Sequence, residues 1–468
     1  MPEEVTPRET IPLRPRQALA LVAILAVAVF MLVCEAHGRT MESAAAVILL
    51  CIGLWATGWL PGWLTGLVFF SLCMAAHVAP AADVFAGFAS SATWLVLSGL
   101  IIGASIRHTG LGDRLAARLA PHIGQSFGRA IALVAASSAA LAFAMPSSLG
   151  RVMLLLPILR ALADRLGYPE ESRGRRGIIL AGVLGTFLPA FAVLPANIPN
   201  NVFVGTVEAV LGASPRYGAY LLLHFPVLGL LKLAVLIALL IRLFRDTPVR
   251  DAAAAPAPAA GLTPPERHLA AVLCLAIGLW ATDGWHGISA AWIGMPVAVW
   301  CLFPGSGLLG KNPFAAMKLE PVFYVAGIVS LGVLADHSGL GARVANWAVS
   351  VLPLAPNAPA ANFGILTGLS SLLGLVVTLP GVAPVLTPLI PSLSAATHWP
   401  PLAVAMTQVV GFSTVLLPYQ APPLVVAIQS GGVAARDVTR VCLLLAGLTI
   451  ALLWPLDYLW WVALGWIG

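Results

Sequence analysis

The most constraining feature of this sequence is that three of its landmarks occur twice, in the same order along the chain. A glycine-rich motif, a pair of prolines at a fixed spacing, and a proline-flanked break in an apolar run each have a second copy. The copies are residues 108–116 (HTGLGDRLA) and 337–345 (HSGLGARVA), Pro146 with Pro157 and Pro380 with Pro391, and residues 194–199 (LPANIP) and 417–422 (LPYQAP). A chain that repeats three landmarks in order is predicted to fold as two related halves.

Both halves are too apolar for a water-soluble fold. Hydrophobic residues make up 59% of the 468-residue chain, charged residues make up only 9%, and the mean hydropathy is +0.94. Apolar runs close to the ~20 residues that cross a bilayer recur from Leu19 to Trp461. We therefore predict an all-α integral membrane protein, in which the first run, residues 18–34, is a retained helix rather than a removed signal peptide.

The placement of basic residues predicts the topology. With a cytoplasmic N-terminus, only Arg39, Arg216 and Arg343 of the basic residues in the loops fall on the outer side. This asymmetry fits about eleven transmembrane helices with the C-terminus outside, so that the two halves are inverted repeats. The predicted parts are residues 1–42 with the first helix, a first repeat at 43–245, a cytoplasmic Ala/Pro-rich linker at 246–266, and a second repeat at 267–468.

Each half contains a pair of apolar runs that are too short for full crossings. Residues 130–145 and 151–166 are predicted to form a re-entrant hairpin with its tip at residues 146–150. An irregular tip inside the bilayer is tolerated only where it lines a cavity in the protein. The second hairpin is predicted from residues 360–378 and 385–396, with its tip at 380–384.

After each hairpin comes an apolar segment that prolines interrupt. The first broken helix is predicted over residues 178–194 and 202–211, divided at 195–201, and the second is divided at 418–423. Proline removes a backbone donor and clashes with the preceding turn. The carbonyl groups freed in this way suit a cation, and the new helix N-terminus suits an anion. Paired broken helices of this kind are typical of secondary transporters.

Polar side chains near the tips and breaks are the candidate ligands. Arg151 follows the first tip, where a charge costs at least ~2.5–3.5 kcal/mol on insertion scales. It either binds an anion, replaces a missing sodium ion, or pairs with a protein group that shapes the hairpin. The other substrate-binding candidates carry hydroxyl or amide groups. They are Ser147, Ser148, Asn197, Asn200, Asn201, Thr414, Tyr419 and Gln420, with Gln420 aligned to Asn197. Tip capping and turn chemistry are their structural alternatives.

Three ionisable residues in the apolar runs have other interpretations. Lys232 is interpreted as a lysine that snorkels or pairs within the scaffold. His224 is interpreted as a satisfied interior histidine, with a proton relay as the alternative. Glu208 is the acid nearest the predicted site. A structural role is its first interpretation, and carrying a coupling proton is the alternative.

The second break resembles that of the divalent anion:sodium symporter family, which is part of the ion transporter superfamily. Residues 417–424 (LPYQAPPL), with Gly431 and Gly432 beyond them, are similar to the family pattern LPVATPPN. Residues 196–200 (ANIPN) stand where the first family repeat reads GTPPN. The resemblance covers roughly residues 43–465, and it implies a homodimer in which the part that contains the hairpins moves.

The two predicted hairpin tips differ from the family pattern. Family tips carry Ser-Asn-Thr, which hold sodium ions and substrate carboxylates. In their place stand Ser147, Ser148 and Leu149 in the first tip, and Gly381, Val382 and Ala383 in the second. Both tips lack the asparagine. The candidate sodium ligands that the resemblance implies are therefore Ser147, Asn200 and Gly381, and no cofactor beyond a coupling sodium ion is implied.

Together these features predict a secondary active transporter in the inner membrane. We expect a symporter of a small anion, such as a dicarboxylate or sulfate, that works by alternating access and couples to sodium as the resemblance implies. A sodium-independent permease that uses protons or exchange is the alternative. A passive channel would need a continuous polar pore, and an enzyme would need gathered catalytic groups, whereas the acids here are scattered. The expected partners are the anion, the lipid bilayer and a second copy of the chain, and no nucleic acid.

Overall fold

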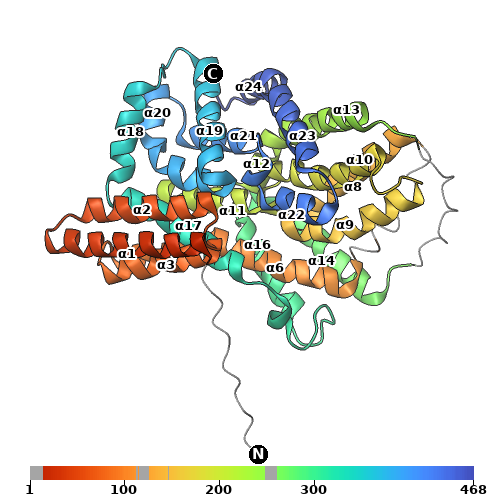
Figure 1. Cartoon of the computed structure of the whole chain (residues 1–468), viewed down its shortest axis with the longest axis horizontal. Coiled ribbons are helices and arrows are strands. Elements are labelled where there is room, and N and C mark those ends of the chain that lie inside the picture. The colour runs from red at the N-terminus through yellow and green to blue at the C-terminus, as the bar shows by residue number, and fades with distance from the viewer. Residues whose placement is uncertain (1–13, 112–113, 115–125, 146, 248–260, 468) are drawn as a thin grey trace, which may run out of the picture.

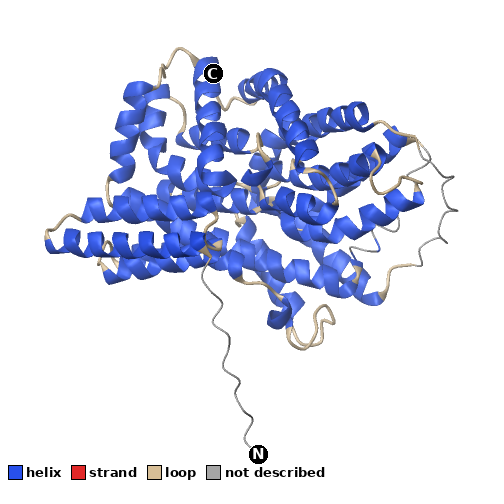
Figure 2. Ribbon diagram, in the orientation of Figure 1, coloured by secondary structure: helices blue, strands red, loops and turns tan. Residues whose placement is uncertain are grey.

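The computed structural model describes residues 14–111, 114, 126–145, 147–247 and 261–467. Every regular element in these ranges is a helix and none is a strand, which confirms the all-α prediction (Figure 2). Six helical runs in this part of the chain are long and apolar enough to cross a membrane. They are Pro15–Ala36, Phe127–Ala144, Arg173–Ala192, Tyr217–Phe244, Pro359–Thr397 and Ala435–Ala463. The total of about eleven crossings stays a prediction.

Three apolar helices lie side by side at the start of the chain (Figure 1). They are α1 (Pro15–Ala36), α2 (Thr40–Thr57) and α3 (Gly62–Ala75). The residues predicted as a first helix, 18–34, lie within α1. Only Ala20, Met31 and Cys34 of α1 are buried, so most of this apolar helix faces outward. An outward apolar surface of this kind suits the hydrocarbon of a bilayer.

The first hairpin and the helix after it form one packed group. The chain reaches this group through α4 (Ala81–Val84), α5 (Ala86–Ala89) and α6 (Ser91–Thr109). The group consists of α8 (Phe127–Ala144), α9 (Ser148–Arg165) and α10 (Arg173–Phe187), and both α8 and α9 pack against α10. Gly185 permits a close approach of α10 to α8, because a Cβ there would lie 2.7 Å from the Ala135 carbonyl oxygen. The division between α8 and α9 lies where the sequence predicts a tip, and Pro146 is outside the described residues.

The first broken helix breaks earlier than predicted. A helix was expected to continue to residue 194, but α10 ends at Phe187. Pro189 explains the early end, because it has no N–H to donate and its ring clashes with the turn before it. Two short 3-10 segments follow, η2 (Pro189–Ala192) and η3 (Leu194–Ala196), before α11 (Ile198–Leu211) begins.

One long helical run, Tyr217–Phe244, completes the first half. It consists of α12 (Tyr217–His224), a π-helical segment η4 (Phe225–Leu231) and α13 (Lys232–Phe244). The predicted linker follows, and its residues 248–260 lie outside the described ranges. The second half then begins with helices in the order α14 (Pro264–Ala281), α15 (Asp283–His286), α16 (Ala290–Leu302), η5 (Pro313–Ala316), α17 (Glu320–His337) and α18 (Leu340–Val351).

The second hairpin turns at a different residue from the one predicted. Helix α19 (Pro359–Leu386) has a sharp kink at Thr378, where φ is 62° and ψ is 170°. The predicted tip at residues 380–384 is therefore wrong, because these residues are helical. Pro380 is tolerated directly after the kink, since the first turn of a helix has no partners for its N–H groups. The chain continues through η6 (Thr387–Leu389) and α20 (Ile390–Thr397).

The second broken helix also breaks earlier than predicted. Helix α21 (Pro401–Phe412) ends before residue 413, so the break begins ahead of the prolines at 418–423. The prediction placed all of 418–423 in the break, but only η7 (Pro418–Gln420) and Ala421 belong to it, since α22 (Pro422–Gly431) starts next. The chain ends in α23 (Ala435–Leu448), a π-helical segment η8 (Thr449–Leu453) and α24 (Trp454–Ala463).

Helices of the first half pack on helices of the second. Helix α11 packs against α19 and α22 packs against α9, while α3 packs against α17 and α6 against α16 (Figure 1). Aromatic rings join the two breaks, because Phe412 lies 5.8 Å from Phe191 and 6.3 Å from Phe203 between ring centroids. Both breaks therefore lie in the same buried core.

Candidate anion-binding site at the helix breaks

Arg151 is fully buried in the first turn of α9 and makes five hydrogen bonds. Its Nε donates to Thr186 Oγ1 at 2.8 Å, and its Nη2 donates to Ser148 Oγ and to the Thr186 carbonyl, both at 3.1 Å. Its Nη1 donates to the Ala196 carbonyl at 3.0 Å and to the Met145 carbonyl. A guanidinium has five N–H donors, so these bonds can engage all of them.

The atoms around this guanidinium come from two elements that the chain must hold together. Met145 and Ser148 belong to the hairpin tip, whereas Thr186 and Ala196 belong to the first broken helix. All five acceptors are uncharged, and no ion pair links Arg151 to a carboxylate among the described residues. A shell of carbonyl and hydroxyl oxygens is also the kind that a small hard cation prefers. The guanidinium therefore occupies a place that suits a cation.

Two asparagines organise the start of α11. Asn197 is the N-cap, and its Oδ1 accepts a hydrogen bond from the Asn200 backbone N–H at 2.9 Å. The Nδ2 of Asn200 donates back to three carbonyls of the broken segment, those of Ala190, Phe191 and Val193, at 3.0–3.2 Å. These bonds tie the start of α11 to the backbone of the broken segment, whose carbonyls also accept from the N–H groups of Val193 and Ala196 and from the Tyr220 hydroxyl.

Gln420 has the corresponding place in the second break. It is fully buried, and its Oε1 accepts from the backbone N–H groups of Leu416 and Leu417, both at 2.8 Å. Its Nε2 approaches the neighbouring hairpin, since a Cβ on Gly374 would lie 3.3 Å from it. The side-chain oxygen of Gln420 thus pairs the backbone while the amide nitrogen is left over, as at Asn197.

Four buried side-chain atoms at the breaks lack a hydrogen-bond partner. Two are donors, Asn197 Nδ2 and Gln420 Nε2, and two are acceptors, Asn200 Oδ1 and Asn201 Oδ1. An unpaired buried polar atom costs about 1–3 kcal/mol and calls for a ligand, an ion or a water. The two donors belong to Asn197 and Gln420, which occupy aligned positions in the two breaks. Amide N–H groups of this kind suit an oxyanion.

The remaining candidates either make hydrogen bonds to backbone groups or lie inside a helix. Ser147 caps α9 and accepts from the Gly150 N–H at 3.1 Å, and buried Thr414 donates to the Val410 carbonyl at 2.9 Å. Tyr419 is 49% exposed and donates to the Leu375 carbonyl at 2.6 Å. Gly381 lies inside the helical part of α19 that follows the kink.

The structure thus brings the candidates together as two groups rather than one. Ser148 and Arg151 meet the first broken helix, while Gln420 and Tyr419 join the second break to the second hairpin. No hydrogen bond connects the two groups in the described part of the chain.

Two features of this region were missed by the sequence analysis. Thr186 holds Arg151 with both its hydroxyl and its carbonyl, and a lone threonine in an apolar run carries no distinguishing signal. Lys232 donates to the carbonyl of Ser413, the C-cap of α21, at 2.6 Å, which places a second buried cation at the second break. Lys232 was interpreted as pairing within the scaffold, but the carbonyl it pairs with belongs to the break. Glu208 accepts hydrogen bonds from the backbone N–H and the hydroxyl of Ser91.

Comparison with known families gives one match over almost the whole chain. The sequence family described as the sodium:sulfate symporter transmembrane region matches residues 14–467 of this chain. This match covers both breaks and both hairpins.

Individual relatives are more distant. A membrane protein of Cupriavidus necator is 24% identical over 401 residues, which cover 82% of this chain and 77% of that protein. The L-tartrate/succinate antiporter of Escherichia coli K12 is 28% identical over 163 residues, which cover 33% of this chain and 32% of the antiporter. This second match therefore spans only about a third of either protein.

Two solved structures have a similar fold. The YdaH transporter of Alcanivorax borkumensis superposes with a TM-score of 0.52 at 15% identity, covering 82% of this chain and 87% of that one. MtrF of Neisseria gonorrhoeae superposes with a TM-score of 0.52 at 15% identity, covering 81% and 82%. At this identity the likeness concerns the arrangement of helices alone.

Proposed function

Since the chain belongs to the sodium:sulfate symporter family, we propose that it is a secondary transporter that moves small divalent anions by alternating access. The observation that carries the proposal is that a buried cation, Arg151, lies at the first break and that each break holds an unpaired amide donor, Asn197 Nδ2 or Gln420 Nε2. Donors and a fixed positive charge attract an oxyanion and repel a cation. Dicarboxylates are the preferred substrate class, since one relative is an L-tartrate/succinate antiporter, and sulfate is the second.

The hydrogen bonds of Arg151 favour sodium-independent transport. The oxygens that could hold a cation between tip and break already accept hydrogen bonds from the guanidinium. A permanent internal cation fits exchange of one anion for another, because the empty carrier keeps an uncompensated charge that disfavours its return across the membrane.

Sodium-coupled symport is the second candidate function. It is favoured by the unpaired acceptors Asn200 Oδ1 and Asn201 Oδ1, which suit a cation. Ser147 and Gly381 are the further sodium ligands proposed for this candidate, together with Asn200.

The proposed architecture is a pair of inverted repeats with about eleven crossings. Its support is the same order of helices in both halves, including a broken helix and a final run with a π-helical segment in each. The reciprocal packing of α11 on α19 and of α22 on α9 also supports it. A homodimer in the inner membrane, with the N-terminus in the cytoplasm and the C-terminus outside, completes the proposal.

Transport by purified protein in proteoliposomes tests the function. Labelled succinate and sulfate are supplied outside, and a sodium gradient, a proton gradient or an internal anion is supplied one at a time. We expect uptake with internal anion and no sodium. Uptake that requires a sodium gradient would favour the symporter instead, and absence of uptake under all three conditions would contradict anion transport.

A further inference from the structure

The last helical run of each half lies against that of the other. Segment η4 contacts η8 and α24, and α13 contacts α23. Both runs contain a π-helical segment, which is frequent at functional positions. The polar side chains buried along these runs are His224, Lys232, Thr449 and Asp457, each at most 2% exposed. Ionisable groups are costly inside a membrane protein and are typical of function.

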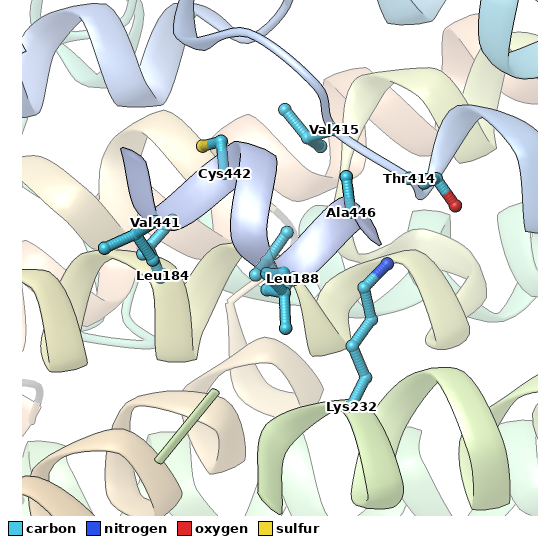
Figure 3. Close-up of a pocket in the computed structure, with 9 residues that line it drawn as sticks. Leu184, Leu188, Lys232, Thr414, Val415, Val441, Cys442 and Ala446 are labelled. Carbon is cyan, nitrogen blue, oxygen red and sulfur yellow. The ribbon is translucent and has the colours of Figure 1, made fainter. Parts of the chain in front are cut away.

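Lys232 connects this cluster to the second break. Its Nζ donates to the Ser413 carbonyl at 2.6 Å, and Ser413 is the C-cap where α21 ends. Figure 3 shows Lys232 extending from α13 with its amine toward Thr414 and Ala446, beside a small pocket that Cys442 also lines. A fixed cation therefore holds a freed carbonyl at the second break, as Arg151 does at the first.

Asp457 is the buried acid of this cluster. It is 0% exposed, and neither of its carboxylate oxygens makes a hydrogen bond within 3.5 Å in the described part of the chain. The indole N–H of Trp461 lies near the carboxylate and is also unpaired at that distance. Asp457 interacts electrostatically with the charge of Lys232, but no ion pair within 4.0 Å joins the two groups. A buried carboxylate without donors is far more costly than the neutral carboxyl group. The observed arrangement, with Lys232 bound to Ser413, therefore suits a protonated Asp457.

Other titratable groups that face the pair come from the surrounding helices. His224 lies on α12, with both ring nitrogens unpaired and its ring 4.6 Å from that of Tyr220 and 5.8 Å from that of Trp461. Tyr220 donates to the Phe191 carbonyl at 2.7 Å, and Cys442 comes from α23. The pocket residues from α10 and from the second break are not titratable; they are Leu184, Leu188, Thr414 and Val415. Lys232 and Asp457 are thus the cation and the acid of the cluster.

We infer that Asp457 and Lys232 form a proton-binding centre behind the second break, which links proton binding to anion binding. In one state Asp457 is protonated, and Lys232 binds the Ser413 carbonyl as it does in this structure. In the other, the Asp457 carboxyl gives its proton to water, and Lys232 turns from Ser413 to the carboxylate. The second break is tied to Lys232 only in the first state, so anion binding at the break and proton binding at Asp457 favour each other.

The inference rests on the proposed transport function, and calorimetry separates the two. Binding of succinate to detergent-purified protein is measured in two buffers of different ionisation enthalpy, at a series of rising pH values at which succinate is fully ionised. The series is needed because uptake occurs only where part of the anion-free protein has Asp457 ionised. The difference in heat gives the number of protons taken up per anion bound. We expect measurable proton uptake by the wild type and by Asp457→Glu, and none by Asp457→Asn. Tyr458→Phe, a change on the residue next to Asp457, is the matched control and is expected to keep the uptake.

Each outcome decides one of the two proposals. Anion binding without proton uptake by the wild type at every pH of the series, or with unchanged uptake in Asp457→Asn, overturns the proton-binding centre and leaves anion transport standing. Absence of binding by succinate and by sulfate contradicts the proposed function instead. If Asp457→Asn does not fold, Lys232→Met provides the second test, because losing the ammonium leaves Asp457 neutral in both states. Retained proton uptake in Lys232→Met overturns the inference.

Discussion

Replacing Arg151 by alanine removes the side chain that ties the first hairpin tip to the first broken helix. The Met145 carbonyl oxygen loses its charged donor, and the Ala196 carbonyl oxygen keeps only the hydrogen bond from Ser148 Oγ at 3.3 Å. A buried acceptor left without a partner costs about 1–3 kcal/mol and a lost hydrogen bond to a charged group about 1.5–3 kcal/mol, so the joined arrangement loses about 2–6 kcal/mol. At about 1.4 kcal/mol for each tenfold change in an equilibrium, the lower figure is about a 30-fold loss.

Exchange of succinate across proteoliposomes measures this loss. We expect Arg151→Ala to exchange at least about 30-fold more slowly than the wild type in sodium-free buffer. Arg151→Lys is expected to be intermediate, because an ammonium keeps the charge but has three donors in place of five. Arg160→Ala is the matched control, since Arg160 is exposed on the same helix, and it is expected to keep the wild-type rate.

Sodium makes the test sharper. If the guanidinium stands in the place of a cation, Arg151→Ala leaves an oxygen shell that sodium can enter. We therefore expect sodium to restore part of the exchange in Arg151→Ala and to have no effect on the wild type. Full exchange by both Arg151 variants in sodium-free buffer, at equal expression, would refute the reasoning.

Three further changes have defined outcomes. Asn197→Asp keeps the cap on α11 but replaces the free amide donor with an acceptor. Succinate affinity measured by calorimetry should therefore fall about ten- to a hundredfold with little change in Tm, and an unchanged affinity would contradict the donor role. Gly411→Ala places a Cβ 2.3 Å from the Ser370 Cβ and should lower the free energy of unfolding by about 1–3 kcal/mol, measured by thermal unfolding. Its control is Gly53→Ala on α2, where the new Cβ has nothing within 4 Å and should not destabilise, so equal Tm values of the two variants would refute this packing argument. The half-buried ion pair of Arg176 and Asp437 joins α10 to α23 at 2.6 Å. A double-mutant cycle with alanine should give a coupling energy of about 1 kcal/mol, and strictly additive losses of unfolding free energy would contradict it.

The elements that follow from proline and apolar patterning could be predicted from the sequence. The pair α8 and α9 and both broken helices lie where the apolar runs and prolines indicate. The boundaries could not be predicted as well. Pro189 lies inside an apolar run and ends α10 early, while Pro380 lies inside a helix because the kink is at Thr378. A proline forbids a hydrogen bond, but it does not specify on which side of itself the helix ends.

The candidate site was predictable in part. Arg151, Asn197 and Gln420 were identified because polar groups near a break in an apolar run are expensive unless they are used. The partners of these residues were not predictable. Thr186 and the Lys232 bond to Ser413 depend on contacts between distant segments, which neither spacing nor composition reveals.

The two breaks solve the same electrostatic problem with different residues. At each break a helix ends inside the core and leaves carbonyl groups that need a donor or a cation. Arg151 supplies it at the first break from the adjacent hairpin, and Lys232 supplies it at the second from α13. With Asp457 protonated, the proposed site carries two fixed positive charges, which matches a divalent anion. With Asp457 ionised, one of these charges is neutralised inside the protein. Loss of the proton therefore lowers the attraction for a dianion more than for a monoanion, so a preference for divalent substrates should weaken as the pH rises through the titration of Asp457.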